Sequence, residues 1–146
     1  MLVLLPPRPA ADAASDDDAP AAVAGFITTC WDIGLEISSS VRSVDECVAD
    51  GLRDVTLQTA FLEARFLCGS RRVYDAFRHA TAEAIDPKAF LHAKTVEMRQ
   101  RHRKFEDTPY SLEPNCKESP GGLRDLQTVL WIARAAGRAA TGPSWR

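Results

Sequence analysis

The chain has 146 residues, of which 45% are apolar and 26% are charged, and its formal net charge is −2. This length accommodates one domain with a buried core, and the composition is that of a folded globular protein. Because the chain has no basic excess, nucleic acid and anionic membranes are disfavoured as partners. No apolar run in the sequence approaches the roughly 20 residues that cross a bilayer, so we expect a cytoplasmic protein without a membrane partner.

The sequence opens with a short apolar segment, MLVLL, at residues 1–5. Pro6 and Pro7 follow it, which is typical of a buried β-strand that ends at the prolines. Because a lone strand cannot satisfy its own backbone, we expect partner strands upstream and read the chain as a fragment of a longer protein. Residues 6–20 are rich in Ala, Asp and Pro, which indicates a solvated linker.

An acidic strand is predicted next. A helix over residues 21–30 leads into WDIGLEI, where apolar residues alternate with Asp32, Gly34 and Glu36. Both carboxylates would therefore project from one face of a strand, with space above the glycine between them. The alternation fits an edge strand with a wet face as well as it fits a functional acidic strand.

The rest of the chain is predicted to be helical. Ser43 and Glu46 form a capping-box pattern, and Asp54 and Asp86 are further cap residues, the latter followed by Pro87. The predicted helices span residues 43–53, 54–68, 71–85, 87–105 and 123–136. The third is expected to bury Val73, Phe77 and Ala84, and the fifth to bury Leu126, Val129, Leu130 and Ala133.

A glycine turn stands directly before the last predicted helix, in the segment KESPGGLRDLQ at residues 117–127. Gly121 and Gly122 give the backbone unusual freedom, and a turn that runs into a helix start presents amide groups that suit an anion. By the residues alone, a plain loop before a helix is favoured, because a glycine pair is a weak motif.

Several classes of chemistry lack their signatures in this sequence. It contains no GxxxxGK[ST] phosphate loop and no GxGxxG, and its four cysteines are too widely spaced for a zinc site. His79, His92 and His102 are read as surface residues of helices. The acidic strand, the basic run RQRHRK and the glycine turn remain, and these fit metal-assisted phosphoryl or nucleotidyl transfer.

Four segments carry a resemblance to a known family: WDIGLEI, SSVRSVDEC, DVTLQTAFLEARFLCG and RQRHRKFEDTPYSLEPNCKESPGGLRDLQTVLWIARAAG. They resemble the bacterial PII uridylyltransferase, also called the uridylyl-removing enzyme, and the resemblance extends from Met1 to about Gly137. Glutamine-synthetase adenylyltransferase is the related enzyme most easily confused with it.

The resemblance implies an α+β protein that is predominantly helical. Residues 1–40, with the linker at 6–20, would form the last part of a polymerase-beta-like nucleotidyltransferase sheet. Residues 41–137 would form the adjoining helical domain, and residues 138–146 a tail without structure. The implied activity is the Mg²⁺-dependent transfer of UMP from UTP to a tyrosine of the PII nitrogen-regulatory protein, so PII and UTP are the implied partners.

The resemblance also implies roles for individual residues. Asp32 is the candidate for a metal-binding catalytic carboxylate, with Glu36 as the second candidate. Lys117 and Arg124, together with the glycine turn at Gly121 and Gly122, are candidates for contacts to the nucleotide phosphates, or for packing of this loop against the catalytic cleft.

The chain departs from the family pattern in two respects. Ser38 and Ser39 stand where the family commonly has Gly-His, and the family's aspartate pair would precede Met1. A chain without that pair is expected to be inactive alone, because one carboxylate cannot position both the metal and the attacking oxygen. A non-catalytic helical interaction module and a vestigial truncated chain are the alternatives.

Overall fold

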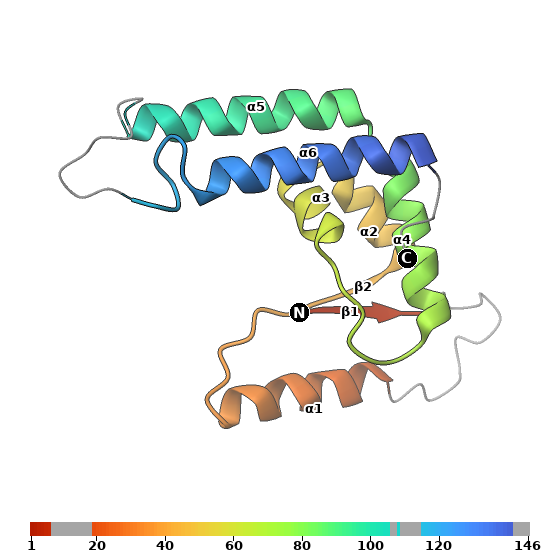
Figure 1. Cartoon of the computed structure of the whole chain (residues 1–146). Helices are drawn as coiled ribbons and strands as arrows, with labels where there is room; N and C mark the ends of the chain where they lie inside the picture. The colour runs from red at the N-terminus through yellow and green to blue at the C-terminus, as the bar shows by residue number, and fades with distance from the viewer. Residues whose placement is uncertain (7–18, 106–107, 109–114, 142–146) are drawn as a thin grey trace.

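The computed structural model describes residues 1–6, 19–105, 108 and 115–141, and Figure 1 shows the arrangement of its elements. In chain order these are β1 (Leu2–Leu5), α1 (Ala19–Asp32), β2 (Ser40–Ser43), α2 (Val44–Gly51), α3 (Val55–Leu62), α4 (Arg71–Ala84), α5 (Pro87–Lys104) and α6 (Leu123–Thr141). The predominantly helical α+β class is confirmed. The predicted linker lies outside the described residues from 7 to 18, as does the part of the predicted tail from 142 to 146.

The two strands form a small parallel sheet. Leu2 pairs with Ser40 and Leu5 with Ser43, and Ser40 N donates to Met1 O at 2.9 Å. The predicted strand at the start of the chain forms, but its residues are half-buried and not fully buried, and its partner is SVRS. The boundary predicted between residues 40 and 41 falls inside β2, which continues without a gap into α2.

The predicted helix starts are confirmed by their caps. The side chain of Ser43 accepts from Glu46 N, and the Glu46 carboxylate accepts from Ser43 N at 2.7 Å, which completes the capping box. Asp54 accepts from Thr56 N at 2.7 Å, and Asp86 accepts from Lys88 N at 2.9 Å. These short-range bonds depend on sequence spacing alone, which is why the sequence predicted them.

The helix predicted to reach Gly69 ends earlier, because α3 stops at Leu62. The hydroxyl of Tyr74 donates to Ala64 O at 2.9 Å, and the rings of Phe66 and Tyr74 lie 5.5 Å apart. The segment after α3 is therefore bound to α4 instead of continuing the helix. Gly69, with φ of 101°, belongs to the turn that starts α4.

Two apolar clusters hold helices α2 to α6 together. One lies beside the sheet and contains Cys47, Phe61 and Phe77, with Leu2 and Leu4 of β1 packed against it. Burial raises the pKa of the Cys47 thiol, so this side chain acts as a neutral apolar group. The other cluster joins α3 and α4 to α5 and α6 through Leu62, Ile85, Phe90, Trp131 and Ala135.

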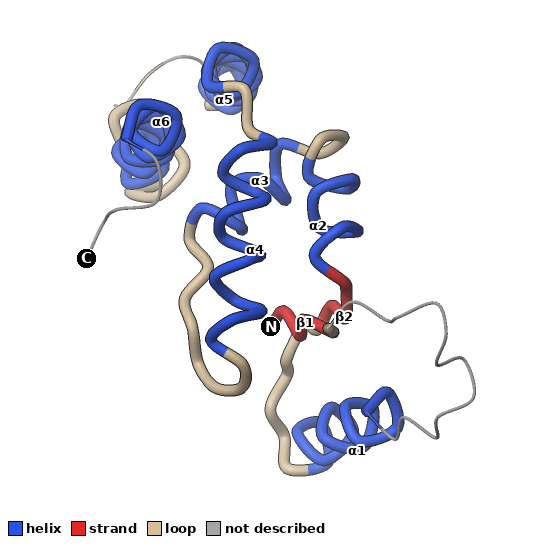
Figure 2. The backbone as a smooth tube through the Cα atoms, turned by 90° about the vertical axis from the view of Figure 1, so that its right-hand side faces the viewer, coloured by secondary structure: helices blue, strands red, loops and turns tan. Residues whose placement is uncertain are grey.

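The side of α6 that is buried differs from the prediction. Leu126, Val129 and Leu130 are 63%, 65% and 55% exposed, whereas Thr128, Trp131 and Ala135 are buried. Trp131 fixes this rotation, because its Nε1 donates to Glu63 Oε1 at 2.9 Å and its ring lies 4.8 Å from Lys94 Nζ. In Figure 2, α6 is viewed almost along its own axis, and α5 and α4 lie on one side of it.

Replacing Phe77 by Ala should destabilise the protein by about 3–5 kcal/mol, the range for removing a buried aromatic side chain. Phe77 is fully buried and meets Phe61 edge-on with ring centroids 5.3 Å apart. Urea unfolding followed by circular dichroism measures the change. Phe26→Ala is the matched control, because Phe26 is 54% exposed and should change stability little. Equal losses for the two variants would contradict this description of the core.

Candidate functional site

The segment WDIGLEI is not a strand: Trp31 and Asp32 end α1, and residues 33–37 form the turn and the loop that follow it. Gly34 N donates to Trp31 O and Leu35 N donates to Cys30 O, both at 2.9 Å, and Gly34 has φ of 84°. This is a Schellman motif, in which a glycine in the left-handed conformation closes the helix. The indole of Trp31 then donates to Ile37 O at 3.2 Å and holds the following loop against the helix end.

The two predicted catalytic carboxylates therefore do not share a strand face. Asp32 is the last residue of α1, Glu36 lies in the loop that leads to β2, and both side chains are exposed. Neither forms a hydrogen bond or an ion pair with the described residues, and no group of three potential metal ligands occurs among those residues. Their metal role stays a prediction.

Three of the predicted phosphate contacts, Lys117, Gly121 and Gly122, lie in one compact turn before α6, and Arg124 follows as the second residue of that helix. The Asn115 carboxamide oxygen accepts from Lys117 N at 3.1 Å and from Glu118 N at 2.9 Å. Further along, Leu123 N donates to Cys116 O and Arg124 N donates to Lys117 O, both at 2.9 Å. The amides at the start of α6 are thus already bound by carbonyls of the preceding turn.

Each glycine of the turn has its own structural reason. Gly121 has φ of 78°, and its N–H donates to Asp125 Oδ2 at 2.7 Å. A Cβ atom on Gly122 would lie 2.8 Å from both Cys116 O and Ser119 O, closer than such contacts allow. The sequence SPGG therefore forms a backbone turn in which positions 121 and 122 require glycine.

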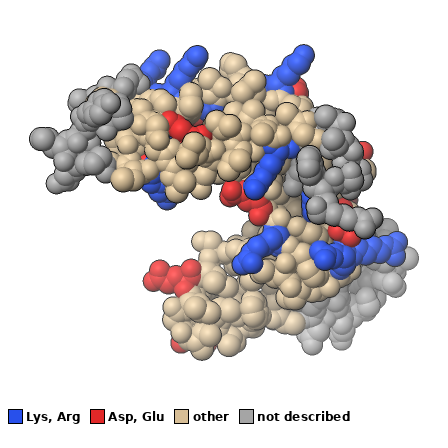
Figure 3. All heavy atoms as spheres, viewed as in Figure 1, with Lys and Arg blue, Asp and Glu red and all other residues tan. Residues whose placement is uncertain are grey.

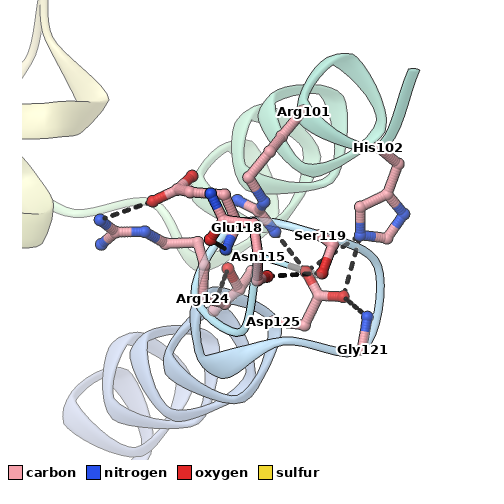
Figure 4. Close-up of polar contacts among 9 residues, drawn as sticks. Arg101, His102, Asn115, Glu118, Ser119, Gly121, Arg124 and Asp125 are labelled. Atoms are coloured by element: carbon pink, nitrogen blue, oxygen red, sulfur yellow. Dashed lines mark hydrogen bonds and ion pairs between the residues drawn. The ribbon is translucent and has the colours of Figure 1, made fainter. Parts of the chain in front are cut away.

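Asp125 is the centre of a polar cluster that joins the two longest helices (Figure 4). Arg101 donates to Asp125 Oδ1, and His102 Nε2 lies 2.9 Å from Oδ2. These two residues come from the basic end of α5, whereas Asp125 lies in the first turn of α6. Together with the bond from Gly121, the cluster fixes the position of the glycine turn against α5.

The cluster keeps Asp125 ionised. Burial would raise the pKa of this carboxyl, but the hydrogen bonds from Gly121 N–H, His102 and Arg101 more than offset it, and the pKa lies below its ordinary value. A negative charge near the N-terminus of α6 also interacts favourably with the helix dipole. Asp125 thus occupies the place that an external anion would otherwise take.

Arg124 is turned toward its own helix. Its Nη2 lies 3.5 Å from Glu118 Oε1, and its guanidinium carbon lies 5.6 Å from the centre of the Trp131 ring. Lys117, by contrast, is exposed at the surface of the turn. Of the two predicted cationic contacts, only Lys117 points to solvent without a carboxylate partner among the described residues.

The two sets of predicted site residues are not brought together. The end of α1 that carries Asp32 lies below the two strands in Figure 1, and the turn before α6 lies above them. The space-filling view shows the surface hollowed between the part over α1 and the part over α5 and α6, with acidic side chains at the end of α1 (Figure 3). The hollow separates the carboxylates from the glycine turn.

The residues of the polar cluster were not identified from the sequence. The sequence predicts His102 at the surface and places Arg101 in a basic run suited to phosphate, yet both side chains bind Asp125. The available signal was charge: four basic residues end α5, and Asp125 is the only acidic residue in the first turn of α6. Which partner such charges meet depends on the packing of the helices, which local spacing does not encode.

Replacing Asp125 by Asn should lower the free energy of unfolding by about 2 kcal/mol at neutral pH, because it leaves the nearly buried Arg101 without its charged partner. The folded pKa of Asp125 is depressed, so its stabilisation is present above about pH 4 and is lost as the pH falls through the folded pKa. The difference between wild type and variant should therefore close below about pH 4.

Urea titrations of both proteins across this pH range measure that difference. Asp75→Asn is the control, because Asp75 is an exposed carboxylate of α4 with no partner among the described residues. A difference between wild type and Asp125→Asn that stayed the same at low pH would show that the charge of Asp125 is not what stabilises the turn.

In the described segments, no helix combines the length and the apolar character needed to cross a bilayer. Comparison with known proteins gives a consistent assignment. The family model described as GlnD PII-uridylyltransferase matches residues 89–145, a range that contains most of α5, the glycine turn and α6. No solved structure matches the chain.

Curated relatives extend the similarity to the whole chain. A bifunctional uridylyltransferase/uridylyl-removing enzyme of Cupriavidus pinatubonensis is 52% identical over all 146 residues, which make up 16% of that protein. Proteins of the same name from Burkholderia thailandensis and Burkholderia mallei are 62% identical over 121 residues, or 83% of this chain and 14% of theirs. The chain spans about one sixth of the length of these relatives, and the resemblance found in the sequence is confirmed: it belongs to the PII-uridylyltransferase family.

Proposed function

We propose that this chain is a segment of an enzyme that transfers UMP from UTP to a tyrosine of the PII protein in the cytoplasm, with Mg²⁺ as the metal. The relatives named above are uridylyltransferases, which favours UTP over the ATP of the related adenylyltransferases. In this proposal Asp32 and Glu36 supply oxygen ligands of the kind that Mg²⁺ prefers.

The register of the sheet is the observation that carries the proposal. Because β1 and β2 are parallel, the N-terminal end of β1 lies beside the segment that leads into β2, and the Met1 amine contacts Ser38 O. In the family pattern, the aspartate pair leads into the apolar strand that β1 resembles. An aspartate pair in that place would therefore lie at the same sheet edge as the loop that carries Glu36.

Asp32 and Glu36 differ from most other carboxylates in having no bonding partner among the described residues, which supports the same site. Most carboxylates in the described part of the chain cap a helix or bind a basic or aromatic side chain, as Asp50 does with Arg42. Asp32 and Glu36 do neither, so both are available to a ligand. Asp45 and Asp75 share this property but lie on α2 and α4, away from the sheet edge.

The test uses the full-length Cupriavidus relative with this chain in place of its matching segment, since the two align over all 146 residues. Transfer of labelled UMP to PII is measured. Asp32→Asn and Glu36→Gln should each slow transfer by roughly 100-fold if the side chain binds the catalytic metal. Asp75→Asn is the matched control and should leave the rate unchanged. If neither site variant differs from the control, these carboxylates have no metal role.

The glycine turn is tested in the same enzyme by Arg124→Ala. A role in binding the phosphates predicts that KM for UTP rises about tenfold, the effect of losing one charge-assisted contact. A role in packing alone predicts an unchanged KM and a lower melting temperature, because Arg124 stacks on Trp131. Lys117→Ala, at an exposed position without a packing role, separates the two effects.

A further inference from the structure

A large aromatic side chain at the end of α1 lies outside both apolar clusters. Trp31 is 56% exposed, so burial does not account for an indole at this position. Its Nε1 instead donates to Ile37 O at 3.2 Å. Figures 1 and 2 show α1 away from the other helices. In the part of the chain that the structure describes, no other side-chain hydrogen bond joins α1 to the segment that leads into β2.

The segment that Trp31 holds is a compact turn around Glu36. Ile37 N donates to Leu35 O at 2.9 Å, which makes a γ-turn with Glu36 as its central residue. On one side of Glu36, Leu35 N is bound to Cys30 O in the motif that closes α1. On the other side, the indole binds Ile37 O. The backbone is thus fixed on both sides of the carboxylate.

We propose that Trp31 is a positioning residue for the transfer reaction, and that it acts by holding the Glu36 carboxylate at the sheet edge. The inference rests on the proposed function, because it gives Trp31 a role through Glu36. A carboxylate on a loose loop loses backbone freedom when it binds a cation, whereas a carboxylate on a fixed turn has already lost it. Glu36 has no hydrogen bond or ion pair with the described residues, so its orientation depends on the backbone that carries it.

The alternative is that only the apolar surface of the Trp31 ring matters. Trp31→Phe separates the two roles, because phenylalanine keeps an aromatic ring and has no N–H group to donate. Phe26→Leu is the matched control. Phe26 lies on the same helix and is 54% exposed, which is close to the exposure of Trp31, but its side chain has no hydrogen-bond donor.

Amide hydrogen exchange of the 146-residue chain, followed residue by residue, measures whether the indole holds the turn. In Trp31→Phe the amides of Leu35 and Ile37 should exchange at least several-fold faster, because the turn has lost one of its two anchors. The amide of the buried Phe77 should exchange as in wild type, and Phe26→Leu should leave both turn amides unchanged. Unchanged exchange of Leu35 and Ile37 in Trp31→Phe overturns the proposal.

The functional test uses the full-length Cupriavidus relative that carries this chain. Transfer of labelled UMP to PII is measured against the Mg²⁺ concentration. In Trp31→Phe the Mg²⁺ concentration for half-maximal transfer should rise about tenfold, the effect of removing a group that orients a metal ligand. The rate at saturating Mg²⁺ and KM for PII should stay unchanged. A purely structural role predicts instead a lower rate at every Mg²⁺ concentration, and that result overturns the proposal.

Glu36→Gln separates a failure of this inference from a failure of the proposed function. If Trp31 acts through Glu36, the shift in Mg²⁺ dependence disappears when Trp31→Phe is made in the Glu36→Gln background. An equal shift in both backgrounds overturns the inference. If Glu36→Gln slows transfer but Trp31→Phe behaves like Phe26→Leu, the inference is wrong and the proposed function stands. If Glu36→Gln transfers UMP at the parent rate, the metal role of Glu36 is wrong, and the positioning role of Trp31 is wrong with it.

Discussion

The packing of α5 and α6 against α3 depends on the burial of Trp131. Its ring lies under the ammonium of Lys94, its Nε1 binds Glu63, and Arg124 approaches it from the start of its own helix. One side chain thereby connects α3, α5 and α6. Lys94 is 97% removed from solvent, and the aromatic ring and Glu97 together compensate for the desolvation of its charge.

A consequence of this arrangement is that the rotation of α6 is set by a polar and aromatic contact rather than by its most apolar side. Hydrophobic periodicity identified the helix and its start, but it assigned the leucines to the core. The pattern could not show that a tryptophan whose hydrogen-bond partner, Glu63, directly follows α3 would decide which side of α6 faces inward. The first strand, the capping box and the proline-initiated α5 were predictable because each follows from short-range geometry.

In the candidate site, too, local features could be predicted from the sequence and contacts between distant segments could not. The alternation in WDIGLEI predicts a strand. Gly34, however, follows the last turn of the preceding helix, and in the structure it closes that helix in a left-handed conformation. The glycine turn before α6 is a turn as predicted, but its amides bind partners within the same chain: the Gly121 amide binds Asp125, and the Gly122 amide binds Ser119 O. Contacts between segments that are more than 20 residues apart, such as Arg101 with Asp125, follow from the tertiary fold and have no local signal.

Ser43 belongs to two elements, because it is both the last residue of β2 and the N-cap of α2. No connecting loop separates the sheet from the helices at this point, so no additional residues lie between β2 and α2 to absorb a rotation. Arg42, one residue earlier, also binds Asp50 in the last turn of α2. A displacement of the sheet, for instance on binding a ligand at its edge, would therefore move α2 with it, because the two elements share Ser43 and are also joined by the Arg42–Asp50 ion pair.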